Sequence, residues 1–125
     1  MEKSTFMNEQ LTDLSRWLKA ICEPNRLMLL EQIIEGVHCN CELGKTLQLT
    51  PNLISHHLSV LRDAGLIEAE HDPIDARYTY YSINRKAMEE LITVFGNFFD
   101  LSRIQPRKLT CGPKMLDQKQ ISFKG

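Results

Sequence analysis

Residues 50–67 read TPNLISHHLSVLRDAGLI, and the chain on either side is arranged around them. Thr50 is a favoured helix N-cap, and Pro51 suits the first helical position, where an N–H group has no partner within the helix. Gly65 is a typical residue just beyond a helix end. The stretch therefore predicts a helix over residues 51–64. From Leu66 onward the apolar pattern changes to a period of two, which is typical of a strand.

The residues before this helix predict a shorter one over about 41–48. Cys39 or Asn40 can act as its N-cap, and Glu42 is placed for a capping box. Because the linker between the two predicted helices is so short, we expect residues 41–64 to form a helix-turn-helix.

The residues after Gly65 predict a β-hairpin. Two strands are expected at 66–70 and 78–83, joined by the polar, turn-rich segment 71–77. A hairpin that directly follows a helix-turn-helix is the wing of a winged helix, here about residues 66–83. The predicted fold class is therefore mainly α with a β-hairpin wing (α+β), a winged helix-turn-helix.

Apolar side chains recur every three or four residues in three further segments, which predicts three more helices. They span residues 8–21, the stretch between Pro24 and Gly36, and residues 84–103. We expect residues 1–105 to form one DNA-binding domain and residues 106–125 to form a basic tail.

The composition is that of an ordinary soluble domain with an uneven charge distribution. The 125 residues carry 15 Lys and Arg against 16 Asp and Glu, a formal net charge of −1. The balance is −3 over residues 1–44, −3 over 45–100 and +5 over 101–125. No apolar run approaches the roughly 20 residues that cross a bilayer, and no secretory signal is visible. We therefore expect a cytoplasmic protein with no membrane partner.

The helix over 51–64 has two faces. Its apolar side chains are expected to face the core: Leu53, Ile54, Leu58 and Leu61. The other face is mostly small or neutral polar, unlike the Lys and Glu of a merely solvated helix: Asn52, Ser55, His56, Ser59 and Arg62. Such groups can reach base edges or phosphates in the major groove. Arg77 in the hairpin is a candidate phosphate or minor-groove contact.

Four cysteines are expected to stay reduced in a chain without a secretory signal: Cys22, Cys39, Cys41 and Cys111. Cys39 and Cys41 form a Cys-x-Cys pair at a predicted helix entry, where the first residue is not yet helical and the two thiols can converge. The positive end of a helix lowers thiol pKa values, and soft thiolates select thiophilic ions over Ca²⁺ or Mg²⁺. Cys22 ends an apolar helix stripe and is expected in the core.

Three runs of residues together resemble the ArsR–SmtB family of bacterial metal-responsive repressors: Cys22–Leu27, Cys39–Leu43 and Ser55–Ile67. The resemblance covers roughly residues 10–103. It implies a homodimer joined through its first and last helices, with two recognition helices entering successive major grooves about 34 Å apart. It also implies that an inducer releases the repressor from operator DNA.

The resemblance also implies a role for the cysteine pair, because Cys-x-Cys followed by an acid and Leu is the thiolate motif of arsenite and cadmium/lead sensors. Cys39 and Cys41 occupy its two positions. The third cysteine of some arsenite sensors is Gly44 here, and residues 1–21 lack the N-terminal cysteines of cadmium/lead sensors. A third thiolate must come from Cys111, which we favour, or from Cys22.

The ligand set favours one class of inducer and leaves others open. Three thiolates suit As(III) or Sb(III), whose lone pair favours a three-coordinate pyramid, whereas Zn²⁺ prefers four ligands. His38 could complete a Cys₃His set, so that Cd²⁺, Pb²⁺ and Zn²⁺ remain alternatives. Oxidation of Cys39 and Cys41 in a thiol-redox sensor is a further one.

An enzyme is not expected. A thiol nucleophile needs a positioned base, and His56 and His57 lie on a different element from Cys39. A purely structural dimerisation domain would leave the neutral polar face of residues 52–62 unexplained. The sequence therefore predicts a homodimeric transcriptional repressor, released from operator DNA when As(III) or Sb(III) binds Cys39, Cys41 and Cys111.

Overall fold

The helix predicted over 51–64 is α3 (Pro51–Asp63) in the computed structural model, which describes residues 6–36, 39–107 and 111–112. Thr50 Oγ1 accepts a hydrogen bond from the Leu53 N–H at 3.2 Å, a type of cap that contributes about 0.5–2 kcal/mol. Gly65 follows the helix with a left-handed φ of +82°, as expected of a C-terminal cap. The local signals around α3 are therefore confirmed.

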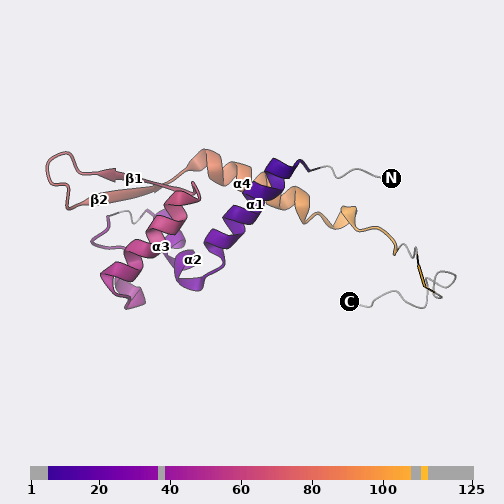
Figure 1. The fold of residues 1–125 in the computed structure, drawn as a ribbon. Helices are drawn as coiled ribbons and strands as arrows, with labels where there is room; N and C mark the ends of the chain where they lie inside the picture. The colour runs from indigo at the N-terminus through magenta and orange to yellow at the C-terminus, as the bar shows by residue number, and fades with distance from the viewer. Residues whose placement is uncertain (1–5, 37–38, 108–110, 113–125) are drawn as a thin grey trace.

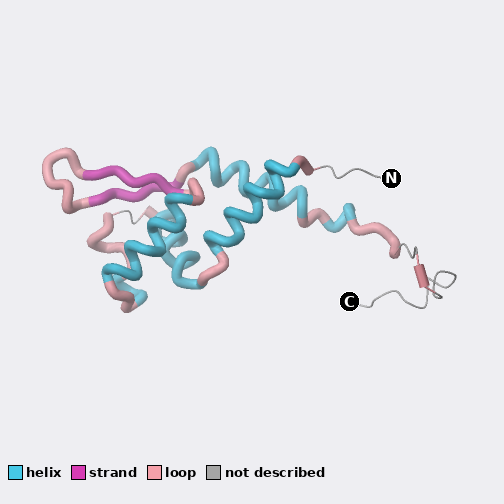
Figure 2. Tube along the Cα trace, in the orientation of Figure 1, coloured by secondary structure: helices cyan, strands magenta, loops and turns pink. Residues whose placement is uncertain are grey.

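The other elements are arranged around α3 (Figure 1). They are α1 (Asn8–Ile21), α2 (Pro24–Ile34), the 3₁₀ helix η1 (Lys45–Leu47), β1 (Ile67–His71), β2 (Thr79–Ile83), α4 (Arg85–Phe98) and the 3₁₀ helix η2 (Leu101–Arg103). The strands pair antiparallel, from Ile67 opposite Ile83 to His71 opposite Thr79. The hairpin stands out from the helices as a wing (Figure 2). The predicted winged helix-turn-helix is confirmed.

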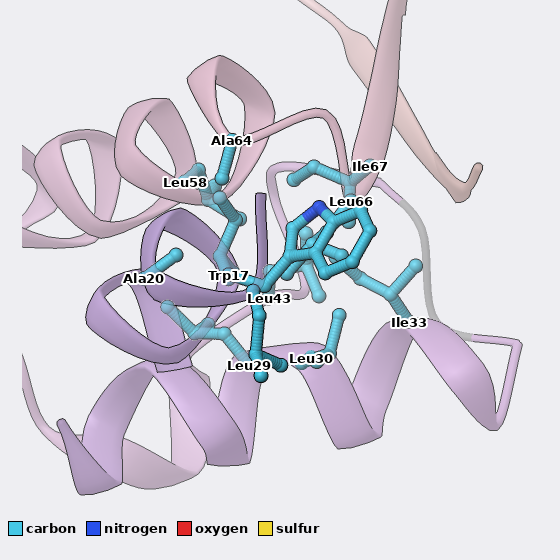
Figure 3. Packing of buried hydrophobic residues seen from close by; sticks show 12 residues of the cluster. Trp17, Ala20, Leu29, Leu30, Ile33, Leu43, Leu58, Ala64, Leu66 and Ile67 are labelled. Carbon is cyan, nitrogen blue, oxygen red and sulfur yellow. The ribbon is translucent and has the colours of Figure 1, made fainter. Parts of the chain in front are cut away.

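One apolar core joins α1, α2, α3 and the base of the hairpin (Figure 3). Trp17 is 4% exposed, and Leu29, Leu61 and Leu66 are fully buried. Each such side chain contributes about 1.5–3 kcal/mol by leaving water. The core therefore fixes α3 against the two preceding helices.

Two side chains of α3, His57 and Leu53, show which residues form the inner face of this helix. His57 is buried, and its Nδ1 lies 3.2 Å from Arg26 Nη1. Since a guanidinium only donates, Nδ1 is the acceptor. The prediction that Leu53 faces the core is wrong, because its side chain is 40% exposed.

Two predicted helix boundaries are also wrong. The helix expected over 41–48 is a turn followed by η1, because Gly44 adopts a left-handed φ of +81° that interrupts any α-helix. The last helix was expected to reach residue 103 but ends at Phe98. Asp100 Oδ1 accepts a hydrogen bond from the Ser102 N–H at 2.9 Å and thereby caps η2 instead.

Helix α4 presents much of its apolar stripe to solvent. Ile92 is 61% exposed, Phe95 40% and Phe99 54%. Met88 and Leu91, on the neighbouring side of the helix, pack against the core. None of the described helices is long and apolar enough to cross a membrane. The exposed stripe is therefore a surface that a protein partner can cover.

Candidate DNA-binding and thiol sites

The polar face of α3 lies as the sequence predicts. Its five candidate residues point away from buried Leu58 and Leu61: Asn52, Ser55, His56 and Arg62 are exposed and Ser59 is half-buried. Asn52 and Ser55 belong to the first turns of the helix, the part that a recognition helix presents to base edges. The structure thus brings the predicted base-contacting side chains together on one open face.

Arg77 lies in the turn of the wing, and its guanidinium is already engaged by Asp75. Nη2 donates to Oδ2 at 2.8 Å, and Nε donates to Oδ1 at 3.0 Å. This hydrogen-bonded pair raises the pKa of Arg77 and lowers the pKa of Asp75. The sequence reasoning missed Asp75, which offsets the positive charge of Arg77.

Replacing Asp75 by asparagine is expected to strengthen DNA binding. The change frees the Arg77 fork for phosphate and removes one negative charge from the wing. Affinity for operator and for random-sequence DNA should rise together, by up to about tenfold at low salt, and the slope of log K against log salt should steepen by up to about one. Fluorescence anisotropy of labelled duplexes at several salt concentrations measures both quantities.

The matched control is Glu89→Gln, which removes the same charge from an exposed carboxylate 3.7 Å from Arg85 on α4. An equal gain in both variants would mean that net charge alone is responsible, and would contradict a DNA contact by Arg77.

The wing turn is held in shape by Asp72. Its Oδ1 accepts from the backbone N–H groups of Ile74 at 2.8 Å and Asp75 at 3.0 Å, and its Oδ2 accepts from Tyr80 Oη at 2.7 Å. These bonds, the one from Tyr80 foremost, lower the pKa of Asp72, while the same contact raises the pKa of Tyr80 to about 12. Because the pKa of Asp72 is lower in the folded state, its ionised carboxylate stabilises the fold at pH values above the ordinary aspartate pKa. This stabilisation is lost as the pH falls through the lowered pKa.

The two cysteines of the Cys-x-Cys pair lie together in the loop between α2 and α3. The Cys39 carbonyl accepts from the N–H groups of Glu42 at 2.9 Å and Leu43 at 3.1 Å, which makes a single helical turn. Cys39 Sγ accepts from the Cys41 N–H at 3.4 Å. Cys39 therefore acts as the cap of this turn, and the two cysteines lie close together, as a helix entry allows.

The predicted lowering of the thiol pKa is wrong for Cys41. Its pKa is raised, mainly by the hydrogen bond to Cys39, with smaller contributions from desolvation and from the charges of Cys39 and Glu42. One helical turn has too small a dipole to outweigh a neighbouring thiol. An ion that binds both sulfurs must therefore displace a proton.

The structure does not bring a third ligand to this pair. Within residues 6–36, 39–107 and 111–112, no group of three His, Cys, Asp or Glu side chains is arranged to hold a metal ion. Cys111 is exposed, and the chain that follows η2, as far as residue 107, leads away from the domain on the side opposite the thiol loop (Figure 1). Cys22 is exposed rather than in the core, and its thiol donates to the Lys19 carbonyl at 3.1 Å. His38 lies outside the described residues.

Gly44 explains why the loop has no third cysteine at this position. A Cβ on Gly44 would lie 2.5 Å from Ile54 Cδ1 and 3.0 Å from Ile54 Cγ1, and the positive φ disfavours any side chain. The Gly44 N–H also donates to Gln32 Oε1 at 3.0 Å. The backbone thus passes directly against Ile54 of α3, which must move if residue 44 carries a side chain.

Gly44→Ala is expected to destabilise the protein by about 1–3 kcal/mol, because Ile54 must repack and alanine must adopt a left-handed φ. For a domain of this size the melting temperature should fall by roughly 4–8 °C per kcal/mol. Circular dichroism melts measure it.

Gly36→Ala is the matched control, since Gly36 has a φ of +104° but a Cβ there meets nothing within 4 Å. The Gly44 variant should lose more stability than this one. Equal losses would show that backbone strain alone matters and that the contact with Ile54 does not.

The chain is similar to known bacterial transcriptional regulators. The family model described as "Bacterial regulatory protein, arsR family" matches residues 23–69. The HTH-type transcriptional regulator CmtR of Mycobacterium tuberculosis is 33% identical over 82 residues, which cover 65% of this chain and 70% of that protein. The arsenical resistance operon repressor of Bacillus subtilis is 28% identical over 87 residues, 69% of this chain and 80% of that protein.

A solved structure has the same fold as this chain. The crystal structure of a possible transcriptional regulator for arsenical resistance superposes with a TM-score of 0.60 at 27% identity, covering 67% of this chain and 84% of the other. The match therefore extends over most of that protein.

Proposed function

Since this chain belongs to the arsR family of bacterial transcriptional regulators, we propose that it is a homodimeric repressor, released from operator DNA when As(III) or Sb(III) binds cysteine thiolates. The observation that carries the proposal is the close approach of Cys39 and Cys41 in the loop that leads into α3, where Cys39 Sγ accepts a hydrogen bond from the Cys41 N–H at 3.4 Å. The regulators it resembles are DNA-binding proteins, not enzymes.

DNA binding is assigned to α3 and the wing. Asn52, Ser55, His56, Ser59 and Arg62 would face the major groove, and Arg77 would contact the backbone or minor groove. The exposed polar face of α3 supports this assignment. Two such helices in a symmetric dimer would read two half-sites of one operator.

The inducer is assigned by the chemistry of the donors and by similarity. Two neighbouring thiols in one loop offer soft ligands to a thiophilic ion. One relative and one solved structure are named for arsenical resistance, which favours As(III) over Cd²⁺, Pb²⁺ or Zn²⁺. Cys111 would be the third ligand, and since residues 104–107 lead away from the thiol loop of their own subunit (Figure 1), we propose that it reaches the loop of the partner subunit. Residues 106–125 would then be a basic tail carrying a ligand beyond the DNA-binding domain of residues 1–105.

One titration tests the proposed function. Operator-bound protein receives arsenite, Cd²⁺, Pb²⁺ or Zn²⁺ separately, while thiolate absorption and operator anisotropy are recorded together. Arsenite should produce a thiolate–ion absorption band and lower operator affinity by an allosteric factor of about 5–150.

Each other outcome has a meaning. Release by Cd²⁺, Pb²⁺ or Zn²⁺ but not by arsenite would show that the inducer is one of these ions, and the assignment as a thiol-sensing repressor would still hold. Release by a mild oxidant alone, reversed by a reductant, would favour the thiol-redox alternative. If nothing releases the operator, the sensing proposal is wrong.

A further inference from the structure

Asn40, the residue between the two cysteines, is bonded to the wing through both its backbone and its side chain. Its N–H donates to the Thr79 carbonyl at 2.9 Å. Its Nδ2 donates to the Arg77 carbonyl at 3.1 Å, and its Oδ1 accepts from the Thr79 N–H at 3.3 Å. These bonds join segments more than 35 residues apart, so Asn40 fixes the thiol loop to the start of β2.

The neighbouring residues extend this junction. Cys39 forms an antiparallel β-bridge with Tyr80, whose hydroxyl holds Asp72 in the wing turn. A groove of about 500 Å³ runs between the loop, α3 and β2, and Cys41, Ser55 and Thr79 are among its lining residues. The thiol loop, the recognition helix and the wing therefore meet at one place.

Asn40 Oδ1 also faces the ion-binding sulfur. The Cys39 thiol donates to this oxygen over 3.6 Å, an ordinary length for a sulfur donor. The same oxygen accepts from the Thr79 N–H. An ion bound to Cys39 takes the place of the thiol proton, so that the oxygen loses one of its two donors and faces a thiolate instead.

The backbone leads to the same result. Two sulfurs that turn toward one ion must come within about 2.3 Å of it. Cys39 Sγ also accepts from the Cys41 N–H, so that a shift of either sulfur toward an ion would be carried by the peptide units on either side of Asn40. Because Asn40 is bonded to the wing at three points, a rotation here displaces Arg77 and Thr79.

We propose that Asn40 is the positioning residue that couples ion binding at the thiol loop to the wing. This inference rests on the proposed function and adds a named relay to it. The wing carries Arg77, so a displaced wing loses its phosphate contact while α3 keeps its fold.

Asn40→Ala tests the relay. At saturating sodium arsenite the variant should show the same thiolate absorption band and stoichiometry as the unmodified protein, while the arsenite-induced drop in operator affinity should be about tenfold smaller. The ratio of affinities with and without arsenite is the decisive readout, because a purely structural role would change stability or ion-free affinity but not this ratio. Amide hydrogen exchange of Thr79 should be faster in the ion-free variant.

Two further variants complete the test. Asn40→Asp keeps the acceptor for Thr79 and loses the donor to Arg77, so its ratio should be intermediate; it also serves if the alanine variant does not fold. Asn97→Ala removes an exposed amide from α4 and should leave the ratio unchanged.

The outcomes separate the relay from the function it rests on. If arsenite releases the unmodified protein and the Asn40→Ala variant equally, the proposed role of Asn40 is wrong, and the proposed function as an arsenite-responsive repressor still holds. If the variant loses the absorption band, Asn40 acts on the ion site itself and the relay is also overturned. If the unmodified protein is not released, the proposed function fails, and the relay fails with it.

Discussion

Replacing Cys39 or Cys41 by serine is expected to abolish the release of operator DNA by arsenite while leaving DNA binding intact. A serine hydroxyl stays protonated at neutral pH and is a poor ligand for soft ions. The arsenite effect should fall from about 5–150-fold to less than about twofold. Operator affinity without arsenite should stay within about threefold of the unmodified protein, as for other surface substitutions. Operator anisotropy and thiolate absorption, recorded in one titration, measure both.

The local structure makes serine a mild substitution. Cys39 Sγ accepts from the Cys41 N–H at the start of a helical turn, and serine is a favoured residue in such a cap. A failure of the variants to respond would therefore report on ion binding rather than on a collapsed loop.

Cys22→Ser is the matched control, because Cys22 is exposed and its thiol bonds the end of its own helix. It should respond like the unmodified protein. If Cys39→Ser and Cys41→Ser also respond normally, the thiol-sensing proposal is wrong. A normal response of Cys111→Ser would remove only the third ligand from the proposal.

The parts of the fold that the sequence predicts are those governed by neighbouring residues. Thr50, Pro51 and Gly65 act on the ends of α3 through contacts within a few positions, and both ends are predicted to within one residue. The end of α4 was missed because apolar residues continue the helical period to Leu101 and Ile104. Asp100 is a favoured cap residue, and its carboxylate accepts from the Ser102 N–H, so that the 3₁₀ helix η2 begins there in place of a continued α4.

The candidate sites were predictable only in part, for a different reason. The spacing of polar residues on α3 and of Cys39 and Cys41 is a property of short segments. The bonds from Asn40 to the wing join distant segments and leave no local pattern. The clash at Gly44 depends on how closely the loop approaches Ile54, which is a result of packing. Residues that connect one functional segment with another are therefore the ones that sequence reasoning missed.

The exposed stripe of α4 leads to the second large effect. Ile92→Glu combined with Phe95→Glu is expected to convert a dimer into a monomer and to weaken operator binding by about 10²–10⁴-fold. Apolar surface of this kind is normally covered by a partner, and Leu101 and Ile104, exposed at 80% and 73%, follow it along the chain. A monomer can bind only one half-site. In the dimer, binding of the first subunit holds the second subunit at a high effective concentration near the other half-site, and a monomer loses this gain in affinity. Light scattering after size-exclusion chromatography and operator anisotropy measure the two effects.

Asn97→Glu is the matched control, since Asn97 is exposed and lies about 200° around the helix from Phe95. It adds a charge to the same helix and should remain dimeric with unchanged operator affinity. Circular dichroism melts must show that the double variant folds; should it not, Phe99→Glu replaces it, because Phe99 follows the last residue of α4 and is 54% exposed. A folded double variant that stays dimeric would place the subunit interface elsewhere than α4. A folded monomer that keeps full operator affinity would contradict recognition by two half-sites, because such affinity would come from a single α3 and its wing.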